Sequence, residues 1–108
     1  MLGRLKLLAA VLAGATLAGS LSAQTVELVR RGTFASNAVA GSEIVAHDPA
    51  SERLFVTNGA TNRIDVLSIA NVDAPTLVRS IDVSAFGVVN SVAVSNGLVA
   101  VALANTSP

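Results

Sequence analysis

Short apolar segments recur along this chain at a nearly fixed spacing, and this periodicity constrains the fold more than any other feature. Residues 44–48 (IVAHD) align with residues 92–96 (VAVSN), which lie 48 positions later. Residues 54–56 (LFV) align with residues 98–100 (LVA) at an offset of 44, because the second turn between the paired segments is shorter. Similarity at a period of 20 to 50 residues indicates that one supersecondary unit is used more than once.

A third match extends the repeat toward the N-terminus. Residues 28–30 and residues 77–79 both read Leu-Val-Arg, at an offset of 49. Three matches at nearly one spacing favour a unit of four strands with a period in the forties, which is the size of one β-propeller blade.

The pattern within the repeat is that of strands and turns. After residue 23, no long stretch carries apolar residues at i, i+3, i+4 and i+7. Short runs of Val, Ile and Leu are instead separated by Gly, Asn, Asp and Pro, which favours short strands. The predicted strands cover residues 26–34, 43–47, 53–57, 63–69, 76–83, 90–95 and 98–103.

The predicted turns have suitable residues. Asn96-Gly97 favours a two-residue hairpin, since both residue types tolerate positive φ. Asp48-Pro49 begins a longer turn at the matching point of the previous repeat. Asn58-Gly59 begins the next link, and Asp73-Ala74-Pro75 interrupts the chain before the strand at 76–83.

These strands predict an all-β fold, a partial β-propeller of about one and a half four-stranded antiparallel blades after an N-terminal signal helix. Strands 43–83 form one blade, and 90–103 form the inner half of a second. Strand 26–34 matches an outermost strand and would complete the last blade of a ring. Because a ring takes about four to eight blades, we expect 24–108 to be the N-terminal part of a longer propeller domain. Residues 92–94 and 98–103 are apolar on both faces, which predicts cover on both sides. A β-sandwich is the alternative.

Residues 1–23 have the order of a secretory signal peptide. Arg4 and Lys6 precede the uncharged run 7–17, and Leu21-Ser22-Ala23 follows and ends in a small residue. We predict cleavage after Ala23, with cleavage after Ser20 as the alternative. An uncleaved membrane anchor is the other interpretation, although 7–23 is at the lower limit of a span of about 20 residues. The product is therefore expected in the periplasm, outside the cell or on its surface.

Composition excludes several classes of protein. Of 108 residues, 52% are hydrophobic and 13% are charged, which argues against a disordered chain. Without Cys there is no disulfide framework and no thiolate metal site. From residue 24 onward the chain has five Arg, no Lys and seven acidic residues, a net charge of −2. This balance argues against a nucleic acid or an anionic membrane as partner.

Three segments resemble the opening blade of choice-of-anchor I family proteins: residues 43–59, 64–67 and 89–94. These are exported bacterial propellers also related to mesenchyme-specific cell-surface glycoproteins. The resemblance covers about 26–105, and its motifs are structural rather than catalytic. It implies a seven-bladed type of propeller on an exported or surface-attached protein, with an anchoring signal beyond the residues given. Some relatives are labelled phosphatase-like, but no catalytic residue can be transferred to this chain.

The candidate ligands are few. His47 and Asp48 form the one His–carboxylate neighbour pair, but adjacent strand residues point to opposite faces, so we interpret them as structural. Glu43 and Asn90 begin inner strands, which face the channel mouth of a complete ring. Oxygen ligands there would suit Ca²⁺, with the remaining ligands supplied by other blades. The alternative role of Glu43 and Asn90 is hydrogen bonding within the preceding loops.

The remaining polar and aromatic residues have structural interpretations. Asp65 and Asp82 are expected to face a strand edge or to pair with Arg63 and Arg79, at a gain of at most about 1 kcal/mol each. Asn105-Thr106-Ser107 is a weak match to a glycosylation acceptor. Three aromatic residues are expected in the core: Phe34, Phe55 and Phe86.

The sequence therefore predicts an exported binding or interaction module, with no catalytic, cofactor-binding or metal residue assigned. The alternative is part of a propeller hydrolase, of lactonase or phosphatase-like type, with a metal at the ring axis. The expected partners are an unidentified protein or surface ligand, and either further blades of the same protein or other copies of this chain.

Overall fold

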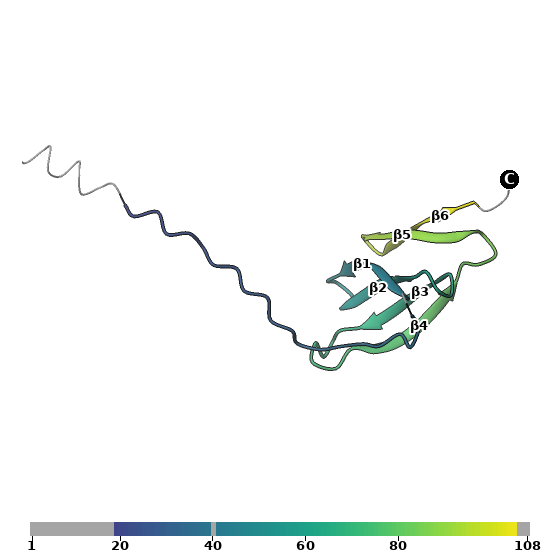
Figure 1. Ribbon diagram of the computed structural model, residues 1–108, viewed down its shortest axis with the longest axis horizontal. Helices are drawn as coiled ribbons and strands as arrows, with labels where there is room; N and C mark the ends of the chain where they lie inside the picture. Colours follow the sequence, from purple (N-terminus) through teal and green to yellow (C-terminus); the bar gives the residue numbers. More distant parts are fainter. Residues whose placement is uncertain (1–18, 40, 106–108) are drawn as a thin grey trace, which may run out of the picture.

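The computed structural model describes residues 19–39 and 41–105 of the protein, and all regular secondary structure within them is β. Four antiparallel strands form one sheet in the order β1-β2-β3-β4, and two more form a second sheet (Figure 1). The strands are β1 (Ser42–Asp48), β2 (Arg53–Asn58), β3 (Arg63–Ser68), β4 (Thr76–Asp82), β5 (Val88–Ser95) and β6 (Leu98–Ala104). This open arrangement is consistent with part of a propeller. The predicted signal helix lies almost wholly outside the described residues.

Strand register confirms the internal repeat. In the first sheet, Val45 is paired with Val56 and His47 with Leu54. In the second sheet, Ala93 is paired with Ala100 and Ser95 with Leu98. Each pair maps onto its counterpart by the two offsets found in the sequence, so β5 and β6 repeat the pairing of β1 and β2.

The turn between β5 and β6 has the predicted conformation. Asn96 has φ of 48° and Gly97 has φ of 77°. Positive φ at both central residues is the geometry that matches the twist of a two-residue hairpin. The longer turn between β1 and β2 also ends on a left-handed residue, Glu52, with φ of 52°.

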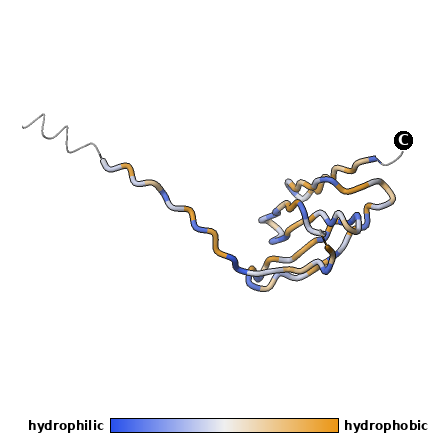
Figure 2. The backbone as a smooth tube through the Cα atoms, viewed as in Figure 1, coloured by the Kyte–Doolittle hydropathy of each residue, from blue (hydrophilic) through white to orange (hydrophobic). Residues whose placement is uncertain are grey.

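The core lies where β5 packs over β1 and β2. Ile64 of β3 is fully buried and clusters with Val83, Val89 and Val92. Ala46, Phe55, Val101 and Leu103 pack against this cluster and are partly buried. Phe55 therefore contributes to the core as predicted. Apolar segments of both sheets meet in this region of the chain trace (Figure 2).

The expected strand at 26–34 is not present. Residues 24–36 are extended but belong to no sheet. Between Arg31 and Val39, exposed and half-buried residues alternate, so one side of the segment packs while its backbone pairs with no neighbouring strand. The predicted strand is therefore wrong, because no neighbouring strand among the described residues supplies the backbone hydrogen bonds that would make this segment one.

One expectation about burial is also wrong. Phe86, which was expected in the core, is 74% exposed in the link between β4 and β5. Cover on both faces of the second sheet was expected from the neighbouring blades of a complete ring, and among the described residues Ala93, Ala100 and Ala102 are exposed. The first sheet covers only the face that carries Val92. Phe34 is half-buried, in agreement with partial packing of its segment.

Candidate functional site

A buried polar cluster lies across β2, β3 and β4. Asn58 Nδ2 donates a 3.0 Å hydrogen bond to Asp65 Oδ2, and Ser80 Oγ donates to Asp65 Oδ1. Asp65 is 5% exposed and Asn58 4%. The expectation that Asp65 faces a strand edge is therefore wrong. Asn58 Oδ1 is buried without a hydrogen-bond partner. One polar atom of the cluster therefore forms no hydrogen bond.

Asp82, in contrast, lies at the surface as predicted. Arg63 Nη2 is 3.6 Å from Asp82 Oδ2, and both side chains are about half exposed. Hydrogen bonds from the Ser84 hydroxyl and then from the Ser84 backbone amide lower the pKa of Asp82, with a smaller contribution from the charge of Arg63. The hydrogen bonds from Ser84 and the ion pair with Arg63 thus hold the Asp82 side chain at the end of β4. No such partner is described for Arg79.

Asn62 joins the two sheets and was not singled out by the sequence. Its φ is 51°, its carbonyl accepts a hydrogen bond from Val83 N at 3.1 Å, and its Oδ1 accepts one from Val89 N at 3.3 Å. One residue of the β2–β3 link therefore orients the start of β5. The only available signal was an Asn in a turn, a residue type that tolerates the left-handed conformation.

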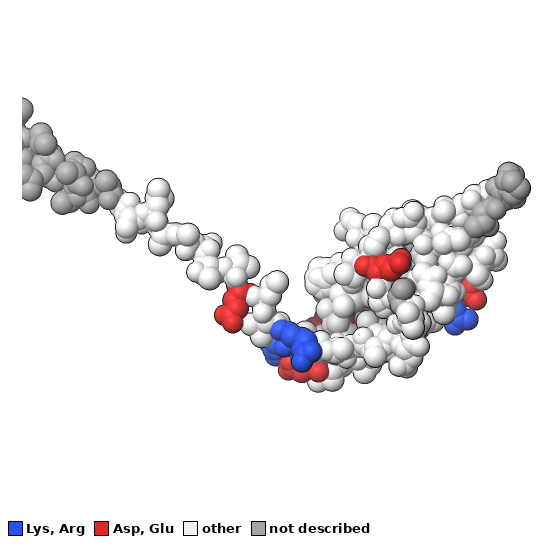
Figure 3. All heavy atoms as spheres, viewed as in Figure 1, with Lys and Arg blue, Asp and Glu red and all other residues white. Residues whose placement is uncertain are grey.

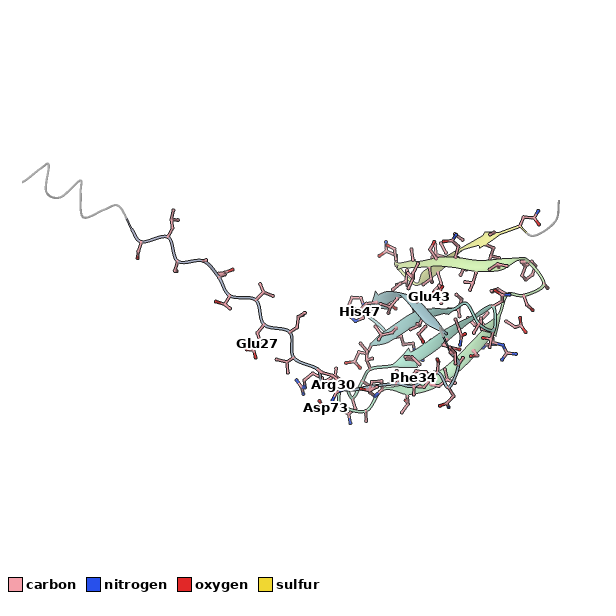
Figure 4. The ribbon with its side chains drawn as sticks, in the orientation of Figure 1. Glu27, Arg30, Phe34, Glu43, His47 and Asp73 are labelled. Carbon is pink, nitrogen blue, oxygen red and sulfur yellow. The ribbon has the colours of Figure 1, made fainter. Side chains whose placement is uncertain are left out.

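The two candidate calcium ligands both lie at irregularities of inner strands. Glu43 falls within the shift of register between Ser42 and Val45. Asn90 falls within the corresponding shift between Val89 and Ser91. Both side chains are exposed, and Figure 4 shows Glu43 on β1. Because β-bulges redirect side chains and are frequent beside active sites, the backbone at both positions is suited to present a ligand.

The carboxylate of Glu43 approaches the start of the β2–β3 link. A Cβ placed on Gly59 would lie 3.1 Å from Glu43 Oε2, and the Gly59 amide donates a 2.9 Å hydrogen bond to the Gly41 carbonyl. The absence of a side chain at Gly59 thus leaves room for this carboxylate. Within the described residues, no group of three His, Asp or Glu side chains could hold a metal ion.

His47 lies at the other end of β1 and is exposed. Asp48 accepts hydrogen bonds from Ala50 N at 3.3 Å and Ser51 Oγ at 2.5 Å. It therefore stabilises its own turn, which agrees with the structural interpretation of this pair. A cleft of about 380 Å³ separates this turn from the β5–β6 turn and is lined by 47–50 and 94–97.

The extended N-terminal segment is attached to the β3–β4 link. Arg31 Nε donates to Asp73 Oδ1 at 2.8 Å and Arg31 Nη2 donates to Asp73 Oδ2 at 3.1 Å. Next to this bidentate ion pair, a Cβ on Gly32 would lie 2.3 Å from the Val72 carbonyl and 2.6 Å from Pro75 Cδ, so only glycine fits. Charged side chains gather where the segment meets the sheets (Figure 3). N-terminal to this contact, the segment extends away from the sheets, with Glu27 on its surface (Figure 4).

The pairing and the repeated register define a class of protein, an all-β repeat protein in which a four-stranded antiparallel sheet is followed by a two-stranded sheet that repeats its first pairing. The family model of the choice-of-anchor I domain matches residues 43–108, and the chain belongs to this family. Membership indicates a surface-associated module. No match was found among curated proteins or among solved structures. Across the described residues, no helix is long and apolar enough to span a membrane.

Proposed function

We propose that this chain is an exported segment of a β-propeller, and that it serves as a binding or interaction module without performing catalysis itself. One observation carries the proposal. The β5–β6 hairpin, residues 88–104, contains no charged residue and exposes apolar side chains such as Leu98, at 77%, and Val99, at 39%. Exposed apolar strands of this kind mark protein interaction surfaces.

The repeat supports the same conclusion. The first unit has four strands, whereas its partner has two with the same register. A two-stranded ribbon is only marginally stable in water. Further β structure packed against this hairpin would supply the missing cover, as expected for a module that acts within a larger assembly.

The first experiment is to determine the intact mass and location of the native product in the producing cell. We expect a product in the envelope or medium whose mass is several times that of residues 24–108. A product that stays in the cytoplasm would contradict export. A mass equal to that of the short chain would contradict the proposal that it is a segment.

A propeller hydrolase with an axial metal is the second candidate function, and the placement of Glu43 and Asn90 at strand irregularities favours it. The native product would be assayed with a lactone and with a phosphate monoester, in the presence of Ca²⁺ and again with a chelator. Calcium-dependent turnover that is lost in Glu43→Gln and retained in the matched surface variant Glu52→Gln would establish catalysis. Equal rates in all samples and in a blank would leave the interaction module as the function.

A further inference from the structure

Among the described strands, only β5 and β6 carry no charged residue, and β5 has a register irregularity between Val89 and Ser91. The edge strand β1 carries Glu43 and His47 and is bulged. The other outer strand of that sheet, β4, carries Arg79 and Asp82. Charges and bulges on edge strands prevent unintended pairing. By contrast, β6 reads Leu-Val-Ala-Val-Ala-Leu-Ala over seven residues and pairs only with β5.

The repeat specifies what belongs at this edge. In the first sheet, the strand equivalent to β6 is β2, and its other neighbour is β3. Phe55 is paired with Val66, Val56 with Asp65 and Thr57 with Ile64. The offset of 44 maps these β2 positions onto Val99, Ala100 and Val101.

We propose that the free edge of β6 binds an antiparallel β-hairpin of the β3–β4 pattern, supplied by a further repeat of the same protein. This partner assignment rests on the proposed function. Branched aliphatic side chains of the incoming strand lie opposite Val99 and Val101 and extend the apolar layer that Val92 and Leu103 begin. The small side chains of Ala100 and Ala102 on the other face accept a polar residue opposite them.

The alignment also specifies which residue of the incoming strand lies opposite each residue of β6. This register can be tested by placing charged side chains at one paired position. A hairpin peptide with the sequence of residues 62–82 carries Asp65 at the position that faces Ala100. In the chain expressed from Met1 and recovered after export, Ala100→Lys should therefore bind this peptide more tightly than Ala100→Asp. Cross-strand pairs of opposite and like charge predict a difference of about three- to tenfold. Ala100 is exposed, so both variants should fold.

The matched control reverses the charge in the peptide instead of the charge in the protein. A peptide with Asp65→Lys should prefer Ala100→Asp. Ala93→Lys and Ala93→Asp should not differ in their affinity for the peptide, because Ala93 lies on β5 and not on β6, along which the peptide is proposed to pair. Binding would be followed by fluorescence anisotropy of labelled peptide, and sedimentation of the chain alone would be measured in parallel.

Three outcomes would overturn the proposal. The peptide fails to bind, it binds with the same affinity to the Lys and Asp variants, or the chain alone forms a stable dimer that Ala100 substitutions disrupt. The last outcome would identify a second copy as the occupant. A large native mass combined with any of them would refute this edge assignment while leaving the proposed function intact.

Discussion

Asn58 Nδ2 donates a 3.0 Å hydrogen bond to Asp65 Oδ2 between β2 and β3, and both residues are more than nine-tenths buried. This contact places a carboxylate inside the first sheet, where Ser80 supplies its second hydrogen bond. A buried polar group that loses its partner costs free energy. The contact is therefore a sensitive point of the fold.

Asn58→Ala should lower the free energy of unfolding by about 1–3 kcal/mol, because Asp65 would lose one of its two donors. Urea denaturation followed by circular dichroism measures this change. Thr61→Ala is the matched control, since Thr61 is exposed in the adjoining link and should change stability by less than about 0.5 kcal/mol. Equal effects at the two positions would show that the hydrogen bond does not stabilise the protein.

Substitutions at Asn62 can separate the contribution of its positive φ from that of its side-chain hydrogen bond. Asn62→Gly should keep the positive φ but lose the hydrogen bond to Val89 N, at a cost of about 1 kcal/mol. Asn62→Val should lose the bond and also strain the backbone, at a cost of about 2–4 kcal/mol. Asn62→Asp keeps an acceptor and should be nearly neutral. If the Gly and Val variants were equally stable, the left-handed conformation at Asn62 would have no energetic consequence.

Asp82 should give stability that depends on pH. Its pKa is lowered from the usual value of 3.8, mainly by the Ser84 hydroxyl. A lowered pKa contributes stability above the unfolded pKa, and this stability is lost as pH falls through the folded pKa. Asp82→Asn should therefore be less stable than the parent at pH 7, and the difference should shrink as the pH falls below the usual value and through the lowered pKa of Asp82.

NMR titration of the Asp82 carboxyl provides the direct control for this prediction. Ser84→Ala should raise the pKa of Asp82 toward its usual value, because the largest cause of the shift is removed. An unchanged pKa in Ser84→Ala would mean that Arg63 or the Ser84 amide is responsible instead.

The turn at Asn96-Gly97 should not tolerate β-branched residues. Replacing both with Val forces two left-handed positions onto residues that resist them, at about 1–3 kcal/mol each. We expect loss of strand signal in circular dichroism and a lower urea midpoint. Asn96→Asp should behave like the parent, since Asp also tolerates this turn. Retention of full strand content in the double Val variant would contradict the hairpin assignment.

The attachment of the N-terminal segment should depend on Gly32. In Gly32→Val the new side chain would overlap the Val72 carbonyl and Pro75, so the segment should detach. Chymotrypsin should then cleave after Phe34 severalfold faster than in the parent. Val29→Ala, at an exposed position of the same segment away from the cleaved bond, is the control and should be cleaved at the parental rate. Identical rates in all three proteins would show that the Gly32 contact does not hold the segment.

Local pattern was enough to predict most of the fold. The six strands, the two-residue turn at 96–97 and the repeat follow from alternating apolar residues and turn-forming residues, which act over a few positions. The four-strand order and the matching register of β1–β2 and β5–β6 follow from the repeat. The surface pair of Arg63 and Asp82 and the structural role of Asp48 were predictable for the same reason.

Tertiary structure decided what depends on residues distant along the chain. Residues 26–34 have the composition of a strand but remain unpaired, because a strand needs a neighbouring edge to supply its hydrogen bonds. Asp65 is buried because Asn58 and Ser80 converge on it from two other strands. Phe86 is exposed because none of the described elements packs over its link. The roles of Asn62 and Gly32 likewise arise only when β5 and the β3–β4 link come within contact distance.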